Sequence, residues 1–233
     1  MSAGLSPLVS AVIPVYNAQE FVAEAIRSVL DQSYKPVEVI AVDDGSTDSS
    51  AEVVAAFGDP VRLVRGTHSG IGGTRNHCVR EARGEFLAFL DADDLWPADK
   101  LRKEVGCLLE SPDVDMVFGG VRQFYHPGLA VPEEERIRME AKVFTGYIAG
   151  AMVVRRSAFE KVGLFREDLR VGEFIEWYAQ AMEAGLGSRM LPDLVLLRRI
   201  HGNNTVLQQR SAQSDYLRIL KAALDRRRGK TAR

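Results

Sequence analysis

The sequence has little cysteine and no long apolar run. Cys78 and Cys107 are its only cysteines, and neither has a second Cys or a His at the spacing of a metal site. Both are expected to be buried thiols within helices. No stretch approaches the roughly 18 uninterrupted apolar residues of a membrane span, and no signal-peptide pattern stands at the N-terminus. We therefore expect a soluble cytoplasmic protein without a transmembrane segment.

The chain also lacks an excess of positive charge. Its 233 residues include 30 Lys and Arg and 32 Asp and Glu, for a formal net charge of -2. This balance argues against a nucleic-acid partner, because non-specific binding to phosphates needs many cations. The last eight residues, 226–233, hold five basic groups and no acidic one. This basic tail could make weak contact with an anionic membrane surface or RNA, but we favour a solvated helix end.

Apolar segments of strand length alternate with amphipathic segments in the first half of the chain, and 46% hydrophobic residues suffice for a core. Expected strands are 8–15, 37–42, 61–64, 86–90 and 115–118, and expected helices are 18–32, 49–57, 72–83 and 97–110. Strands separated by single helices pair in parallel through right-handed crossovers. The sequence therefore predicts an α/β fold with an open, mostly parallel sheet flanked by helices in a single domain.

The second half is less regular. Residues 122–142 contain Pro127, Pro132 and an acidic run, which favours an excursion over the surface. Residues 146–154 are expected to form a buried strand, and Ser157 with Glu160 forms a capping-box pattern for a short helix ending near 163. A helix at 173–184, a strand at 194–200 and an amphipathic helix at 212–228 follow. We divide the chain into residues 1–118, 119–210, and a C-terminal helix and basic tail at 211–233.

Polar side chains follow three of the predicted strands. Tyr16 and Asn17 follow the first strand, the acidic segment 43–48 follows the second, and Asp-Ala-Asp-Asp at 91–94 follows the fourth. Ligands of open α/β sheets bind beyond the carboxyl ends of the strands. These three segments are therefore the candidate binding site.

The carboxylates of 91–94 would repel one another unless a cation or hydrogen bonds compensate. Oxygen ligands from one or two carboxylates, completed by water and phosphates, suit Mg²⁺ or Mn²⁺. The alternative is a turn that caps the following helix.

Two further segments are candidates for binding a nucleotide. Gly45 allows a tight turn beside Asp43 and Asp44, whose carboxylates can accept bonds from a nucleobase NH or a ribose, although the segment could be only a turn. Arg75 and Asn76 lie near a helix start, where the helix N-terminus favours phosphate. The glycines before them lack GxGxxG spacing and do not follow the first strand, which argues against a dinucleotide oxidoreductase.

Several motifs in order resemble those of the family 2 glycosyltransferases of the A-type (GT-A) fold, which act on nucleotide-diphospho-sugars. The matching strings are SAVIPVYN at 10–17, VDDGSTD at 42–48, GTRN at 73–76, GEFLAFLDADDLW at 84–96 and GAMVVRRSAFEKVGLF at 150–165. The resemblance covers roughly residues 8–205. It implies transfer of a sugar from a nucleotide diphosphate sugar, by family frequency a UDP-sugar, to an acceptor, typically with inversion. Residues 1–118 would be the nucleotide-sugar half and 119–210 the acceptor-binding, catalytic half.

The resemblance also implies roles for single residues. Positions that hold the nucleoside are matched by Pro14, Tyr16, Asp43 and Asp44. The DXD motif is matched by Asp91, Ala92 and Asp93, with Asp93 as the usual metal contact and Asp91 near the ribose. His201 matches a place where some members supply a further metal or phosphate contact, and a hydrogen-bonded surface histidine is the alternative.

An inverting transfer needs a general base near the acceptor hydroxyl. The family pattern at a helix start is Glu-Asp with Asp as base, but this chain has Glu173-Phe174, and Phe cannot accept a proton. Glu176 lies three residues after Glu173, so both share a helix face. We favour Glu173 as base with Glu176 second, and the alternative is that both only stabilise the helix N-terminus.

The leading hypothesis is thus a Mn²⁺- or Mg²⁺-dependent inverting glycosyltransferase. A binder of nucleotide sugars that has lost its base is the alternative from another class. Nucleotidyl transfer onto a sugar phosphate is the third, although the Gly-rich, basic first loop usual for that chemistry is absent. The acceptor (a sugar, lipid-linked sugar, peptide or small molecule) and the oligomeric state are not specified by the sequence.

Overall fold

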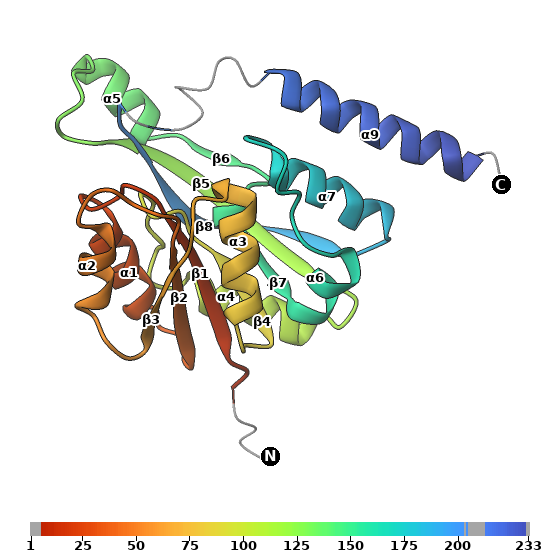
Figure 1. Cartoon of the computed structure of the whole chain (residues 1–233), viewed down its shortest axis with the longest axis horizontal. Helices are drawn as coiled ribbons and strands as arrows, with labels where there is room; N and C mark the ends of the chain where they lie inside the picture. Colours follow the sequence, from red (N-terminus) through yellow and green to blue (C-terminus); the bar gives the residue numbers. More distant parts are fainter. Residues whose placement is uncertain (1–5, 203, 205–212, 232–233) are drawn as a thin grey trace.

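The computed structural model describes residues 6–202, 204 and 213–231, and its centre is an eight-stranded sheet (Figure 1). The strand order is β3-β2-β1-β4-β7-β5-β6, and β8 pairs with β5. This sheet with helices on both faces confirms the predicted single α/β domain. The described part of the chain contains no helix that is both long and apolar enough to cross a membrane.

The first half of the chain forms the parallel part of the sheet. Its elements are β1 (Val9–Val15), α1 (Val22–Leu30), β2 (Val37–Asp43), α2 (Ser50–Ala55), β3 (Val61–Arg65), α3 (Gly70–Glu81), β4 (Phe86–Phe89) and α4 (Lys100–Glu110). β1 pairs in parallel with both β2 and β4, and β2 pairs in parallel with β3. All seven residues of β1 are buried, as the unbroken apolar run predicts for a central parallel strand.

The second half adds antiparallel strands and one further parallel pair. Its elements are β5 (Met116–Tyr125), α5 (Glu133–Glu140), β6 (Val143–Thr145), the 3₁₀ helix η1 (Ala149–Ala151), β7 (Val153–Arg155), α6 (Arg156–Val162), α7 (Glu173–Glu183), β8 (Ser188–Ile200) and α9 (Gln213–Thr231). β7 lies antiparallel to β4 and β5, and β6 lies antiparallel to β5. The predicted helix start at 212, like residues 232–233 of the basic tail, lies outside the described residues.

Three expectations for the second half are wrong in detail. Residues 146–154 are not one strand, because η1 interrupts them and Trp96 donates its indole N–H to the Gly150 carbonyl there. The surface excursion begins after Tyr125 rather than at 122, because β5 pairs with β8 along its length. Ser157 caps no helix, since α6 begins one residue earlier and has no side-chain cap.

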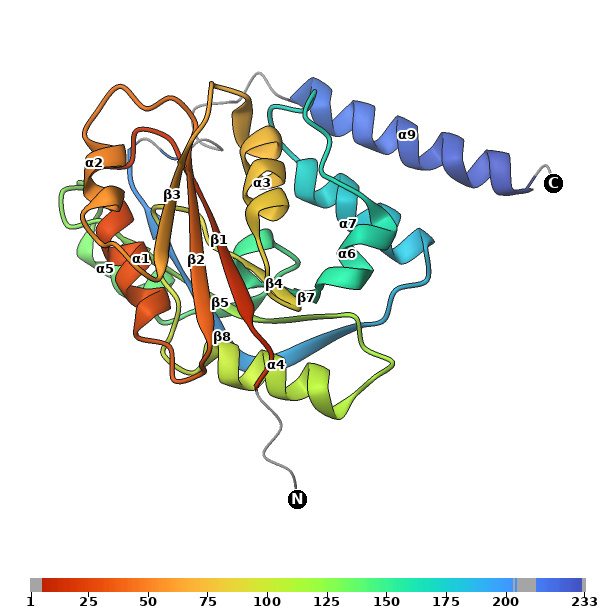
Figure 2. The ribbon, with the colours of Figure 1, turned by 60° about the horizontal axis from the view of Figure 1, so that its bottom comes forward.

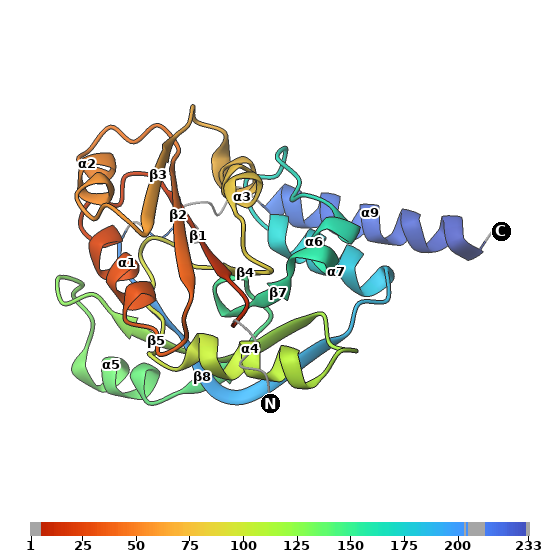
Figure 3. The same cartoon turned by 90° about the horizontal axis from the view of Figure 1, so that it is seen from below.

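The two faces of the sheet carry different helices. Alternate residues of β1, such as Ile13, pack with α1 and α4 in one core, and Val12 packs with α3, α6 and α7 in the other. Figures 2 and 3 show α1 on one side of the sheet and α3, α6 and α7 on the other. Cys78 of α3 lies in the second core, and burial raises the pKa of its thiol to about 12. Cys107 is only partly buried, unlike the expectation for both cysteines.

A fully buried ion pair in α4 predicts a pH-dependent stability. Lys100 and Glu104 lie one helical turn apart with no exposed side-chain surface. Burial raises the pKa of Glu104 from 4.5 to about 7, against the opposing effect of the Lys100 charge. In this pH range the folded state holds a proton that the unfolded state has released, so stability falls as pH rises from 4.5 to about 7.

We expect Lys100→Met/Glu104→Leu to remove this pH dependence and to raise the free energy of unfolding at neutral pH by up to about 2 kcal/mol, because the apolar pair needs no desolvation of charge. Urea unfolding of both proteins at several pH values across the interval measures this. The half-exposed pair Lys103–Asp193 is the matched control, and its apolar replacement should change stability by less than about 1 kcal/mol. An equal pH slope in wild type and the α4 double variant would contradict the prediction.

Candidate active site

The three polar segments meet at one edge of the sheet. β1, β2 and β4 run in parallel, with Val15 paired to Asp43 and Val12 paired to Phe89. The backbone N–H of Asp44 also donates to the Val15 carbonyl. The residues after these strands therefore lie together at the carboxyl edge, toward the top of Figure 1. The sheet thus assembles the binding edge that the sequence predicts.

The loops after β1 and β2 hold each other in place. Asn17 donates its backbone N–H to the Ser46 hydroxyl, and its side-chain oxygen accepts a bond from the Thr47 N–H. Pro14 is buried in β1, whereas Tyr16 is 49% exposed and its ring lies 4.7 Å from that of His68. The interlocked loops therefore present an accessible aromatic face, which suits stacking with a flat ring.

Asp43 carries an acceptor that the described residues do not satisfy. Its Oδ2 accepts a bond from the Ser46 N–H at 3.3 Å, but its buried Oδ1 has no partner in that part of the protein. An unpaired buried carboxylate oxygen costs free energy, and a donor on a ligand would compensate for it.

Both carboxylate oxygens of Asp44 accept hydrogen bonds, in contrast to those of Asp43. Its Oδ1 accepts bonds from the backbone N–H and hydroxyl of Ser69, and its Oδ2 accepts one from the N–H of Gly70. These donors lie at the start of α3, where a carboxylate is also favoured by the helix dipole. His68 Nδ1 lies 3.0 Å from Oδ2 of Asp44. The structure thus gives this residue an anchoring role that the motif alone did not indicate.

The acidic segment after β4 separates into one buried and two partly exposed carboxylates. Asp94 is buried and accepts a bond from the Arg199 N–H at 2.8 Å, which joins the segment to β8. Burial, together with the charges of Asp93 and Asp91, raises the pKa of Asp94 well above its usual value. The side chains of Asp91 and Asp93 are 41% and 28% exposed, and Ala92 between them is buried. Asp91 and Asp93 are therefore the pair available to a ligand.

His201 lies beside Asp93 although 108 residues separate them in the sequence. Its Nε2 is 2.9 Å from Oδ2 of Asp93, and its ring packs 4.7 Å from the ring of Phe21. Asn204 contacts the same Asp93 oxygen at 3.4 Å and accepts the His201 backbone N–H. No sequence signal set Asn204 apart, because an asparagine after a strand is common in turns.

A divalent metal fits this arrangement only as an open site. Within the described ranges, no three His, Cys, Asp or Glu side chains gather as a metal cage. Asp93 and His201 form a two-residue donor set, whereas Asp91 accepts a hydrogen bond from Arg75. The carboxylate of Asp93, completed by water and substrate phosphates, suits Mn²⁺ or Mg²⁺ bound together with a diphosphate, and an imidazole ligand would favour Mn²⁺ of the two.

Arg75 connects the two halves of the site. The side chain is buried on α3, and its guanidinium donates to Oδ1 of Asp91 at 2.5 Å and to Oε1 of Glu173. Burial alone would lower the pKa of Arg75, but the charges of Asp91 and Glu173 raise it above its usual value. Asn76 next to it does not face the site, because its side chain is buried and bonds to the backbone of Phe165.

The two glutamates of α7 have different surroundings. Glu173 is buried against Arg75 and through it reaches Asp91. Glu176 is also buried, but it bonds to Gln180 and to Arg226 of α9. Phe174 between them is buried in the second core. Of the two sequence candidates, Glu173 is therefore the one that the fold connects to the carboxyl edge.

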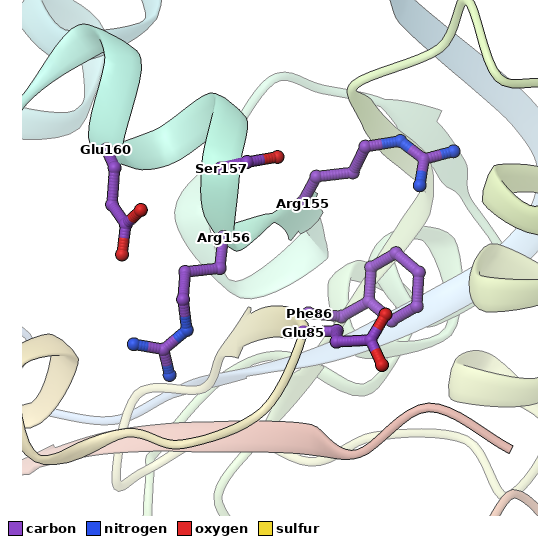
Figure 4. Close-up of a pocket in the computed structure, with 6 residues that line it drawn as sticks. All are labelled: Glu85, Phe86, Arg155, Arg156, Ser157 and Glu160. Carbon is purple, nitrogen blue, oxygen red and sulfur yellow. The ribbon is translucent and has the colours of Figure 1, made fainter. Parts of the chain in front are cut away.

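A surface pocket at the opposite end of β4 does not belong to this site. It is lined by Glu85, Phe86, Arg155, Arg156, Ser157 and Glu160 (Figure 4). The guanidinium groups of its two arginines point to opposite sides, and they bond to backbone carbonyls such as those of Val114 and Gly84. These arginines therefore stabilise the backbone at the amino end of β4.

The open α/β sheet with its polar carboxyl edge defines the class of α/β proteins that bind a ligand beyond the carboxyl ends of their strands. Within this class the chain belongs to glycosyl transferase family 2, whose family model matches residues 10–163. An uncharacterised glycosyltransferase of Rickettsia typhi is 32% identical over 176 residues, which are 71% of this chain and 55% of that protein. The chain thus spans about half the length of this relative.

Solved structures agree on the fold. Staphylococcus aureus TarS 1–349 in complex with UDP-GlcNAc matches with a TM-score of 0.74 at 18% identity, covering 92% of this chain and 65% of that one. The mannosyltransferase PcManGT of Pyrobaculum calidifontis in complex with GDP-Man and Mn²⁺ matches with a TM-score of 0.70 at 20% identity, covering 95% and 65%. These similarities establish the GT-A glycosyltransferase fold.

Proposed function

We propose that this glycosyltransferase moves a sugar from a nucleotide diphosphate sugar to an acceptor hydroxyl with inversion, assisted by a divalent metal. The observation that carries the proposal is a pair of contact sets that meet at residues 91–93 of the carboxyl edge. One set is the Asp93–His201 pair, and the other links Asp91 through Arg75 to Glu173. Together they join groups suited to a diphosphate with a carboxylate suited to an acceptor.

The nucleoside would lie over the loops that follow β1 and β2. The exposed Tyr16 ring supplies a stacking surface, and Oδ1 of Asp43 supplies an acceptor for a base N–H. Uracil and guanine both offer a ring N–H, so this pair of contacts is compatible with UDP and GDP. We favour UDP because UDP-GlcNAc is the ligand in the structure with the higher TM-score of the two.

Asp93 and His201 would hold the metal, with donor phosphates and water as the other ligands. When bound, Mn²⁺ or Mg²⁺ would neutralise the negative charge that develops on the leaving diphosphate. The Mn²⁺ named with the mannosyltransferase supports this choice of metal. Arg75, which binds two carboxylates here, is able to contact a phosphate oxygen as well.

Glu173 would accept the proton of the acceptor hydroxyl. In the proposed step the acceptor oxygen forms a bond to the anomeric carbon while the bond from that carbon to the phosphate oxygen breaks. The proton moves to the Glu173 carboxylate and the nucleoside diphosphate leaves with the electron pair. A donor phosphate that competes for Arg75 would weaken its ion pair with Glu173 and free a carboxylate oxygen for the acceptor hydroxyl.

Thermal unfolding with a panel of nucleoside diphosphates and nucleotide sugars tests the donor site. Mn²⁺ is present, and the nucleotide ligand is added at about 100 times its Kd. We then expect the ligand to stabilise the protein by about 2.7 kcal/mol and to raise Tm by about 5–10 °C. The Asp93→Asn variant should lose this rise, and Asp113→Asn, at an exposed position after α4, is the control. A rise that is unaffected by chelator or by Asp93→Asn would refute the metal-dependent donor site.

A nucleotide-sugar binder without catalysis is the second candidate function. The observation in its favour is that Phe174 stands buried at the usual position of the base, while Glu173 and Glu176 are each paired with an arginine. The binder would show the rise in Tm but release no nucleoside diphosphate from its donor. Turnover with any acceptor, or donor hydrolysis lost in Asp93→Asn, would exclude it.

A further inference from the structure

Among the side chains that the structure describes, the C-terminal helix α9 has one face toward the body of the protein and one face toward solvent. Asp215 and Ile219 are buried, and Oδ2 of Asp215 accepts the Arg170 N–H. Ile219 packs close to Gly172, where an added Cβ would lie 2.7 Å from the Ile219 side chain. Farther along, Arg226 forms ion pairs with Glu176 and Glu183 of α7. This inward face fixes the helix on α7.

The outward face of α9 carries large apolar side chains. Leu217, Leu220 and Leu224 are 67%, 57% and 44% exposed, whereas the ring of Tyr216, although 44% exposed, lies beside Gly172 of the body. Their spacing of three and four residues places the leucines on one helical stripe. Measured at 100° per residue, this stripe lies opposite to the direction of Ile219 and Asp215. Exposed leucines clustered on one face indicate an interaction surface.

The charge of α9 indicates which surface it would contact. Between 213 and 231 the sequence has six basic residues, at 218, 221, 226, 227, 228 and 230, and two acidic ones, at 215 and 225, for a net charge of +4. Arg218 and Arg226 are paired with Asp168 and Glu176 of the body, so the positive charge left for a partner comes from positions 221, 227, 228 and 230. Asp215 is buried, so Asp225 is the acidic residue of the helix that remains exposed. An apolar stripe with positive charge around it is the pattern of helices that lie in the interface of anionic membranes.

The position of α9 agrees with a membrane at this side of the molecule. Figure 1 shows the chain entering β1 from below, whereas α9 lies along the top, on the side where β1 and β2 end. The helix extends past α7, and the three ribbon views agree on this. A bilayer that covered the outward face of α9 would therefore lie on the side of the molecule that carries the carboxyl edge.

We propose that the outward face of α9 docks on an anionic lipid bilayer, with Leu217, Leu220 and Leu224 in the interface, and with Lys221 and the basic positions 227, 228 and 230 of the sequence supplying positive charge for the headgroups. The body-facing side of the helix keeps its contacts with α7, so docking needs no unfolding of α9. The protein would then bind the surface of the membrane without crossing it. The proposal does not depend on the proposed function, because lipid binding is measured without donor or acceptor.

Flotation with vesicles tests this docking. The full chain is mixed with vesicles of phosphatidylcholine alone, or with about a quarter phosphatidylglycerol, at low and high salt. We expect binding to the anionic vesicles, little binding to the neutral ones, and weakening by salt because the headgroup contacts are screened. The triple variant Leu217→Ser/Leu220→Ser/Leu224→Ser should lose at least about tenfold in partition coefficient.

The control variant changes two leucines outside α9 that are also exposed. Leu109→Ser/Leu164→Ser alters residues that are 52% and 43% exposed outside α9, and it should bind vesicles like wild type. Equal Tm values for the three proteins would show that the triple variant is folded. Binding that is unchanged in the triple variant, or absent in wild type, would overturn the proposal. So would a wild-type dimer that becomes monomeric in the triple variant without any vesicle binding, because the stripe would then be a contact between two copies.

Discussion

The variant Glu173→Gln is expected to lower kcat by about 100- to 10,000-fold while donor affinity changes by less than about threefold. Removing a positioned general base costs this much because the acceptor hydroxyl must then lose its proton to water. Gln keeps the size of the side chain but cannot take the proton. Donor affinity should persist, because Asp43, Asp93 and His201 are unchanged. Release of nucleoside diphosphate measures kcat, and a thermal-shift titration measures donor binding.

Glu176→Gln is the matched control for this experiment. Both glutamates are buried on α7 and each is paired with one arginine, so both variants lose one charge from a similar environment. We expect Glu176→Gln to retain turnover within about fivefold of wild type, since its partner Arg226 lies on α9 rather than at the carboxyl edge. A loss confined to Glu176→Gln would reverse the assignment. Full activity in both variants would mean that neither is the base.

The parallel half of the fold was predictable because its inner strands β1, β2 and β4 are buried on both faces. The apolar run at 8–15 needs no periodicity to be recognised, and the structure has β1 at Val9–Val15. β5 and β8 were predicted too short, because their pairing contains register shifts near Gly119 and Gly120. An added Cβ at Gly119 would lie 2.5 Å from Val195, so glycine permits this close approach. A pattern of alternating side chains cannot reveal such an irregularity.

The sequence predicted those site residues that are neighbours along the chain. It did not predict the contacts that the fold makes between distant segments. Asp91 and Asp93 stand together after a strand, which identifies them from sequence. Arg75 and Glu173 are 98 positions apart in the sequence, so no local sequence pattern predicts their contact. Asp44 illustrates the converse. Its place in a motif suggests a ligand contact, but its oxygens accept bonds from the first residues of α3, which only the three-dimensional arrangement reveals.

Replacing Arg75 with Met is expected to lower the free energy of unfolding by about 3–5 kcal/mol. The change leaves Glu173 buried without its cation, and an uncompensated buried charge is costly. Arg80→Met is the control on the same helix α3. Arg80 forms a surface pair with Glu167 at 3.6 Å in which both side chains are half exposed, so its loss should cost less than about 1 kcal/mol. Urea unfolding measures both variants.

A double-mutant cycle with Glu173→Gln separates the charge effect from lost packing. If the unpaired carboxylate causes the instability, Arg75→Met/Glu173→Gln should recover at least about 1 kcal/mol relative to Arg75→Met alone. Arg75→Lys should have a lower free energy of unfolding than wild type, because one ammonium cannot bond to Asp91 and Glu173 at once as the guanidinium does. If Arg75→Met costs no more than Arg80→Met, the bridge contributes little to stability. Its buried guanidinium would then be retained for the donor phosphates, and the variant would lose donor affinity while keeping its fold.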